Sequence, residues 1–117
     1  LAPVDAAVLP LIEDDERLAR KALELKELLV RNGFVVIYDD TGSIGRRYAR
    51  ADEIGVPAAF TVDYQTLEDE TVTMRDRDTW RQVRVKVKEA PEALRKFIYN
   101  LADITELGEP VDRGGQG

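Results

Sequence analysis

The chain has 117 residues, a length typical of one domain, and its net charge is -6, from 23 acidic and 17 basic side chains. Hydrophobic residues make up 44%, enough for a core, whereas cysteine and histidine are absent. These absences exclude a disulfide framework and a thiolate metal site, and they remove the most common general base near neutral pH. No apolar run approaches the roughly 18 residues that span a bilayer, and no export leader is visible. Because the chain begins at Leu1 without a methionine, we expect a piece of a longer protein.

The first half of the sequence predicts strands that alternate with helices. Apolar runs without alternation, typical of strands covered on both faces, occupy residues 5–11, 34–38 and 58–64. Between them, apolar residues at three- and four-residue steps predict helices over 13–32 and 43–55. Right-handed crossovers would make the three strands parallel.

The second half changes to a period of two. Alternating residues over 71–77 and 81–88 predict an antiparallel hairpin with one dry face, and a helix follows over 90–100. Residues 102–117 are polar and glycine-rich, and we expect a loosely held tail. The fold class is therefore α/β, a five-stranded mixed sheet flanked by three helices in the order βαβαβ then ββα. It forms one domain over residues 1–101.

Basic residues cluster in two segments of this acidic chain. In the helix over 43–55, Arg46 and Arg50 point away from the apolar face, while Arg47 lies at its border, so we expect a structural role for Arg47 alone. The hairpin carries six cations against two acids between residues 75 and 88. By parity, all but Arg81 are on its outward face: Arg75, Arg77, Arg84, Lys86 and Lys88. Cations gathered on one flank would favour a polyanionic partner, since phosphate contacts act over about 8–10 Å.

The charged residues of these segments are also compatible with different roles. The arginines could instead pair with nearby acids, as charged residues on a solvated face usually do. The turn over 39–43 opens a helix after a strand, where backbone amides bind anions, but it lacks a phosphate-loop lysine. We predict no metal site and no catalytic carboxylate pair, although a magnesium site is conceivable from five acids: Asp39, Asp40, Asp52, Glu53 and Asp63. Three aromatic residues could stack on unpaired bases: Tyr48, Tyr64 and Trp80.

Two sequence runs resemble a known family. SIGRRYARADEIGVP (43–57) and TVTMRDRDTWRQVRV (71–85) are similar to the C-terminal anticodon-binding domain of archaeal and eukaryotic glycyl-tRNA synthetases, and so is the opening LAPVDAAVLPL. The resemblance covers about residues 1–100. It implies the mixed sheet predicted above and an accessory domain without catalytic residues, metal or cofactor. The parent would be a cytoplasmic class-II homodimer that uses ATP and magnesium in an upstream catalytic domain.

The resemblance also implies an RNA partner, the anticodon end of glycine tRNA, and no membrane. Glycine anticodons end in two cytosines, and an unpaired cytosine requires an acceptor for its N4 amino group beside a donor for N3 or O2. Interleaved acids and arginines meet that requirement, and Arg75 and Arg77 are predicted to contact the bases or their phosphates. The predicted RNA-binding residues are Arg46, Arg50, Asp63, Arg75, Asp76, Arg77, Arg84 and Lys86. The alternative is a protein-interaction or dimer-stabilising module of the same fold that does not read RNA.

Overall fold

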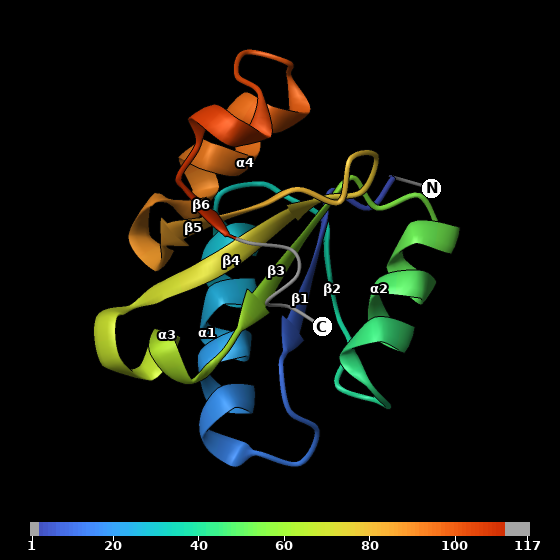
Figure 1. Cartoon of the computed structure of the whole chain (residues 1–117), viewed down its shortest axis with the longest axis vertical. Helices are drawn as coiled ribbons and strands as arrows, with labels where there is room; N and C mark the ends of the chain where they lie inside the picture. The colour runs from blue at the N-terminus through green and yellow to red at the C-terminus, as the bar shows by residue number, and fades with distance from the viewer. Residues whose placement is uncertain (1–2, 112–117) are drawn as a thin grey trace.

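The computed structural model, which describes residues 3–111, has one mixed β-sheet with helices on both faces (Figure 1). The strands are β1 (Ala6–Pro10), β2 (Val36–Tyr38), β3 (Ala58–Val62), β4 (Thr71–Asp76), β5 (Gln82–Lys86) and β6 (Glu109–Val111). The helices are α1 (Glu16–Arg31), α2 (Ile44–Glu53), α3 (Tyr64–Asp69) and α4 (Ala90–Ile98). Two short 3-10 turns, Val87–Glu89 and Ile104–Glu106, complete the order.

The strands lie in the order β2-β1-β3-β4-β5-β6. β1 pairs in parallel with β2 and β3, and each later neighbour is antiparallel, which confirms the predicted mixed α/β sheet. All five residues of β1 and of β3 are buried, as expected for apolar strands between two helical layers. The carboxyl ends of β1, β2 and β3 therefore meet at one edge of the sheet, and the turn between β4 and β5 lies at the opposite edge, at the top of Figure 1.

Helices on the two faces form two hydrophobic clusters. On one face, the predicted α1 stripe of Leu18, Ala22, Leu25 and Leu29 packs with α4 against inward residues of β1, β3, β4 and β5. On the other face, α2 packs against β1 and β3 in a smaller cluster: Ala7, Leu9, Ala51, Val56 and Ala59. We call these the α1/α4 face and the α2 face. Residues of β4 and β5 belong only to the first cluster, so the α2 face is apolar over only part of its width.

The structure differs from the sequence prediction in the number of elements. The helix α3 was not predicted, although Asp63 and Thr66 form a capping box at its start, a signal that the sequence contains. The sheet has six strands, not five, because Glu109–Val111 pairs with β5. The expected tail from residue 102 therefore contributes a 3-10 turn and an edge strand to the fold. Residues 112–117 of that tail lie outside the described residues.

Candidate nucleic-acid interface

Polar side chains of β4 and β5 line the α2 face, and four of them form two cross-strand pairs. Thr73 is opposite Arg84 and Arg75 is opposite Gln82 in the antiparallel register. We call these four residues the polar half-face. The predicted alternation is confirmed, since Val72, Met74, Val83 and Val85 face the other way into the core. The expectation of a solvated outward face is wrong, because Thr73, Arg75 and Gln82 are buried. Within residues 3–111, Thr73 Oγ1 and Gln82 Oε1 have no hydrogen-bond partner.

Arg75 is the most enclosed arginine of the predicted site. Its Nη1 and Nη2 donate to the two carboxylate oxygens of Asp52, at 3.1 and 3.3 Å. Its guanidinium lies 4.5 Å from the ring centroid of Tyr48 and 5.7 Å from that of Trp80. The Tyr48 hydroxyl in turn forms a 2.7 Å hydrogen bond with Thr61, and burial raises the pKa of this phenol. Arg75 is thus fixed between an aromatic residue of α2 and one of the hairpin turn.

Arg84 forms the second ion pair of the polar half-face. Its Nη1 donates to Asp63 Oδ1 at 3.2 Å, and its Nη2 donates to Asp63 Oδ2. Nη1 also donates to the hydroxyl of Thr71 at 3.0 Å. The same Asp63 carboxylate caps α3 by accepting from the amide and hydroxyl of Thr66. Its oxygens are therefore already engaged by the protein.

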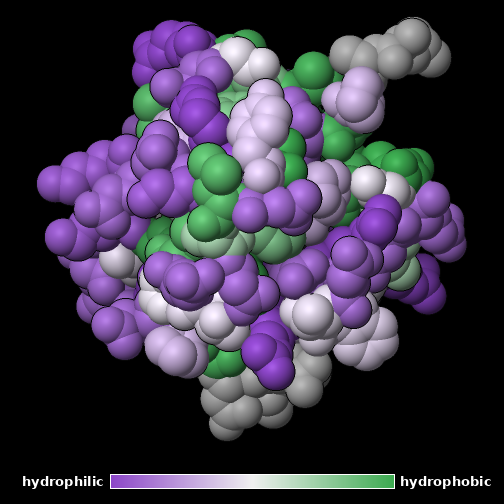
Figure 2. All heavy atoms as spheres, turned by 90° about the horizontal axis from the view of Figure 1, so that it is seen from above, coloured by the Kyte–Doolittle hydropathy of each residue, from purple (hydrophilic) through white to green (hydrophobic). Residues whose placement is uncertain are grey.

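The hairpin turn is organised by Asp76 and presents an exposed indole. The Asp76 carboxylate accepts from the amide of Asp78 at 2.9 Å and from the hydroxyl of Thr79 at 3.0 Å. Trp80 has a positive φ of 62°, unusual for a bulky residue, and its amide donates to the Asp76 carbonyl at 2.8 Å. The Trp80 side chain remains 58% exposed although it contacts Arg75. Figure 2 views the molecule from this end and shows hydrophobic patches within a mainly hydrophilic surface.

Arg77 is a partly exposed arginine of this turn. Its Nε donates to the carboxylate of its neighbour Asp78 at 3.1 Å. Its Nη1 would lie 3.3 Å from a Cβ added at Gly55, which follows the C-cap of α2, so the side chain passes close to the end of that helix. The pair is solvent-exposed, and such pairs exchange readily with other partners. Arg77 is therefore available to a ligand in a way that Arg75 is not.

Helix α2 presents two arginines one turn apart. Arg46 is exposed and makes no side-chain hydrogen bond or ion pair with the described residues. Arg50 donates from Nε and Nη2 to the two carboxylate oxygens of Asp39, at 2.8 and 3.0 Å, and also from Nη2 to the Thr41 carbonyl. The hydrogen bonds from Arg50 hold the pKa of Asp39 below its ordinary value.

Arg47 has the structural role expected for it. It is 1% exposed, and its guanidinium donates to backbone carbonyls of Pro10, Leu11, Asp39 and Gly42. The Gly42 amide at the start of α2 donates to the Glu13 carboxylate at 2.9 Å. An acid of the protein therefore occupies a donor of the turn over 39–43, which favours a tight strand-to-helix turn over a phosphate cradle.

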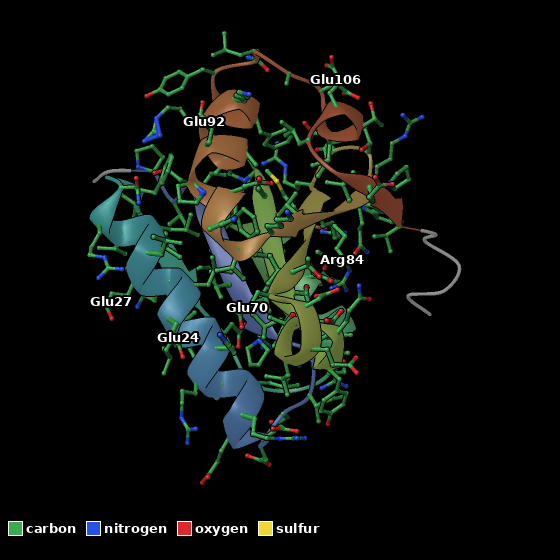
Figure 3. All side chains as sticks on the ribbon, turned by 90° about the vertical axis from the view of Figure 1, so that its left-hand side faces the viewer. Glu24, Glu27, Glu70, Arg84, Glu92 and Glu106 are labelled. Carbon is green, nitrogen blue, oxygen red and sulfur yellow. The ribbon has the colours of Figure 1, made fainter. Side chains whose placement is uncertain are left out.

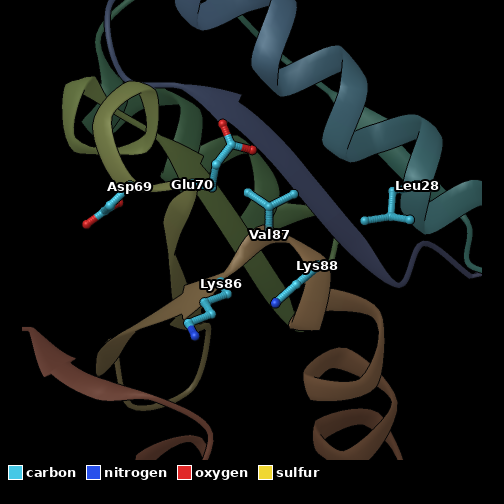
Figure 4. A pocket seen from close by; sticks show the side chains of 6 residues that line it. All are labelled: Leu28, Asp69, Glu70, Lys86, Val87 and Lys88. Atoms are coloured by element: carbon cyan, nitrogen blue, oxygen red, sulfur yellow. The ribbon is translucent and has the colours of Figure 1, made fainter.

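Lys86 lies apart from the other predicted site residues. It lines a surface groove of about 490 Å³ with Leu28, Asp69, Glu70, Val87 and Lys88 (Figure 4). Glu70, at the groove wall, forms an ion pair with Lys21 of α1 at 2.5 Å. Lys88 follows the end of β5 in a 3-10 turn, so its predicted place on the strand face is wrong. The groove opens beside α1, whose Glu24 and Glu27 lie across the molecule from Arg84 in Figure 3.

The cations are therefore only partly segregated. Four of the five predicted arginines each pair with a nearby carboxylate: Arg50 with Asp39, Arg75 with Asp52, Arg77 with Asp78, and Arg84 with Asp63. This pairing agrees with the alternative in which the arginines pair with nearby acids. The distribution of charge alone therefore does not indicate a polyanionic partner. Of the eight predicted residues, only Arg46 and Lys86 have no side-chain partner among the described residues.

Features of other site classes are limited in the part of the chain that the structure describes. No group of three acidic side chains there is arranged to hold a metal ion. Burial and the nearby Asp40 raise the pKa of Tyr38 to about 12, so this phenol is neutral at physiological pH. No helix in residues 3–111 is both long and apolar enough to cross a bilayer.

Comparison with known proteins gives consistent matches. A family model described as "Anticodon binding domain" matches residues 5–97. A glycine–tRNA ligase from Aeropyrum pernix is 65% identical over 95% of this chain and 19% of its own length. One from Archaeoglobus fulgidus is 52% identical over 93% of this chain and 19% of its own length. The chain thus spans about a fifth of the curated relatives it matches.

A solved structure shows the same architecture. The prolyl-tRNA synthetase from Cryptosporidium parvum, complexed with L-proline and AMP, aligns with a TM-score of 0.73 and 25% sequence identity. The alignment covers 86% of this chain and 22% of that one. The sheet described above is therefore shared with a segment of a second aminoacyl-tRNA synthetase.

Proposed function

Because this chain belongs to the anticodon-binding domain family, we propose that it is the part of a glycine–tRNA ligase that binds the anticodon end of glycine tRNA. The remainder of the ligase would join glycine to the tRNA with ATP and magnesium. A homodimeric parent and a cytoplasmic location belong to the same proposal. This chain would position the tRNA without taking part in the chemistry.

The observation that carries the proposal is the hairpin turn beside α2. It combines an exposed indole, a partly exposed guanidinium and an exposed carboxylate within four residues, namely Trp80, Arg77 and Asp78. Stacking on an aromatic ring suits any unpaired base, and a paired donor and acceptor suit the Watson–Crick edge of cytosine. The exposed Asp78 supplies the acceptor that the N4 amino group of cytosine requires.

The eight predicted residues divide into three roles in this proposal. Arg46, Arg50 and Arg77 lie along α2 and at its end, and they would contact RNA phosphates or bases. Four others support that surface from within the protein, since they hold the turn, α3 and the aromatic contacts: Asp63, Arg75, Asp76 and Arg84. Lys86 would add a weaker, longer-range attraction from its groove.

The proposal is tested by titrating this chain with the anticodon stem–loop of glycine tRNA at two salt concentrations. We expect binding that weakens with salt and that falls when the two cytosines are replaced by uracil. Arg77→Ala should weaken binding by about 1–3 kcal/mol and blur the preference for cytosine. Arg20→Ala is the matched control, because Arg20 is an exposed arginine of α1 on the other face.

The alternative of a protein-interaction or dimer-stabilising module gives a different result. It predicts equally weak binding of both stem–loops and no effect of Arg77→Ala. Four of the five predicted arginines already pair with carboxylates of the protein, and this observation favours the alternative. The uracil-substituted stem–loop separates the two functions, because self-association does not respond to the anticodon.

A further inference from the structure

The guanidinium of Arg47 is an unusual feature of the carboxyl edge of the sheet. It is buried, yet its partners are four backbone carbonyls, and it forms no ion pair with any residue of 3–111. A buried cation without a carboxylate is expensive unless many dipoles compensate it. Four of its five N–H donors are engaged, through Nε, Nη1 and Nη2. Lysine could not reproduce this planar set of contacts.

The four carbonyls come from three separate segments. Pro10 and Leu11 lie at the end of β1, Asp39 follows β2, and Gly42 precedes the cap of α2. Arg47 donates to the first pair from Nη1 and, at 2.9 Å, from Nη2. It donates to Asp39 at 3.3 Å and to Gly42 at 3.1 Å. One side chain therefore joins the ends of two strands to the helix that carries it.

The turn held from inside by Arg47 is held from outside by Arg50. The Asp39 carbonyl accepts from Arg47, while the Asp39 carboxylate accepts from Arg50 Nε and Nη2. Arg50 also donates to the Thr41 carbonyl. Both hydrogens of Arg50 Nη1 remain without a partner among the described residues. The position of that free Nη1 depends on the turn, and the position of the turn depends on Arg47.

We propose that Arg47 is a positioning residue that sets Arg46 and Arg50 for joint contact with the RNA backbone. This rests on the proposed function. Arg46 and Arg50 are one helical turn apart on the exposed side of α2, a spacing that brings their Cβ atoms to about 5–6 Å. Arg50 supplies donors fixed by Asp39, and Arg46 supplies donors that the protein leaves free. Without Arg47, the turn and α2 shift independently and the two arginines no longer act together.

The test is the salt dependence of binding to the glycine anticodon stem–loop, for the native chain and three variants. The variants are Arg46→Ala, Arg47→Lys and the double variant. Each lost phosphate contact should reduce the slope of log K against log salt by roughly 0.7. We expect Arg46→Ala to reduce the slope by one such step and Arg47→Lys by at least as much. Adding Arg46→Ala to Arg47→Lys should then change nothing further.

A merely structural role for Arg47 gives a different outcome. A smaller folded fraction lowers the apparent affinity by one factor at every salt concentration, so the slope stays native. The inference would be overturned, while the function stands, if Arg47→Lys kept the native slope of log K against log salt. In that case Arg46→Ala and Arg47→Lys would change the affinity by independent factors that multiply in the double variant. If the native chain ignores the anticodon, both the function and the inference fall. If the native chain reads the anticodon but Arg46→Ala has no effect on binding, the inference alone falls.

If circular dichroism shows that Arg47→Lys does not fold, a second variant provides the test. Gly42 has a φ of 84°, so Gly42→Ala strains the turn, while the new Cβ meets nothing closer than Arg46 Cδ at 4.0 Å. We expect this strain to displace the Gly42 carbonyl from Arg47 without removing a charge. A reduced slope of log K against log salt in Gly42→Ala, which Arg46→Ala does not reduce further, supports the inference. A native slope in Gly42→Ala overturns it.

Discussion

The two faces of the sheet bury the alternate side chains of the same strands in different ways. On the α1/α4 face, Val72, Met74, Val83 and Val85 join one large apolar cluster. On the α2 face, the alternate residues of the same strands form the polar half-face of Thr73, Arg75, Gln82 and Arg84. Helix α2 packs on β1 and β3 instead, through small side chains such as Ala7 and Ala59.

This difference separates the source of stability from the proposed source of RNA specificity. Apolar burial stabilises by about 25 cal/mol per Å² without requiring a particular partner. The polar half-face requires particular partners, because each guanidinium needs its own carboxylate or ring. A substitution on the first face should act on folding, and one at the accessible rim of the second should act on RNA binding.

The largest expected effect is on the α1/α4 face. Phe60→Ala should reduce the free energy of unfolding by about 3–5 kcal/mol, because Phe60 is fully buried and the substitution leaves a cavity. Leu23→Ala, at an exposed position of α1, should change the free energy of unfolding by about 0.5 kcal/mol or less. Urea unfolding followed by circular dichroism measures both. Equal effects would mean that the core does not lie where the structure places it.

The next effect breaks an ion pair of the polar half-face. Arg84→Met should reduce the free energy of unfolding by about 2 kcal/mol, since it leaves Asp63 without its cation in a part-buried site. Fully buried pairs lose more, but these side chains keep 15% and 19% exposure. Asp63→Asn keeps the cap of α3, and combining it with Arg84→Met should add little. Full additivity would show that the two side chains do not interact.

The third prediction concerns the exposed rim of the hairpin turn. Trp80→Ala should weaken binding of the anticodon stem–loop roughly tenfold, about 1.4 kcal/mol, through loss of stacking. The matched control is Tyr99→Ala, which removes an exposed aromatic ring after α4. Fluorescence anisotropy with a labelled stem–loop gives both affinities. An equal loss for the two variants would remove Trp80 from the interface.

The smallest expected effect is a change in the pKa of Asp39. Arg50 lowers the pKa of Asp39, so the folded state favours the carboxylate. The resulting stability is present above the unfolded pKa of about 3.9 and is lost as pH falls through the folded pKa. In Arg50→Gln, the Asp39 pKa measured by NMR should rise toward its ordinary value. An unchanged pKa would show that the pair does not persist in solution.

The sequence was sufficient for most of the fold. Apolar runs, helical periodicity and strand alternation predicted five strands and three helices, each of which is present. The edge strand β6 was missed because its three residues, Glu109–Val111, are too few to show an alternating apolar signal. Helix α3 was missed because six residues are too few to show a period.

The site was less predictable, because it depends on distant pairs. Parity placed Arg75 and Arg84 on the correct face, but not beside Asp52 and Asp63, which are 23 and 21 residues away in sequence. Burial of a polar strand face likewise depends on tertiary packing, which no local pattern contains. The border position of Arg47 was sufficient to predict its structural role, but not its four carbonyl partners.

The most direct test is to map NMR chemical-shift changes when the glycine anticodon stem–loop is added to isotope-labelled protein. We expect changes at the arginine Nε groups of α2 and the turn, and at the Trp80 indole, while the α1/α4 face stays unchanged. Changes confined to α1, α4 or the groove of Lys86 and Lys88 would contradict RNA binding at α2 and the hairpin turn.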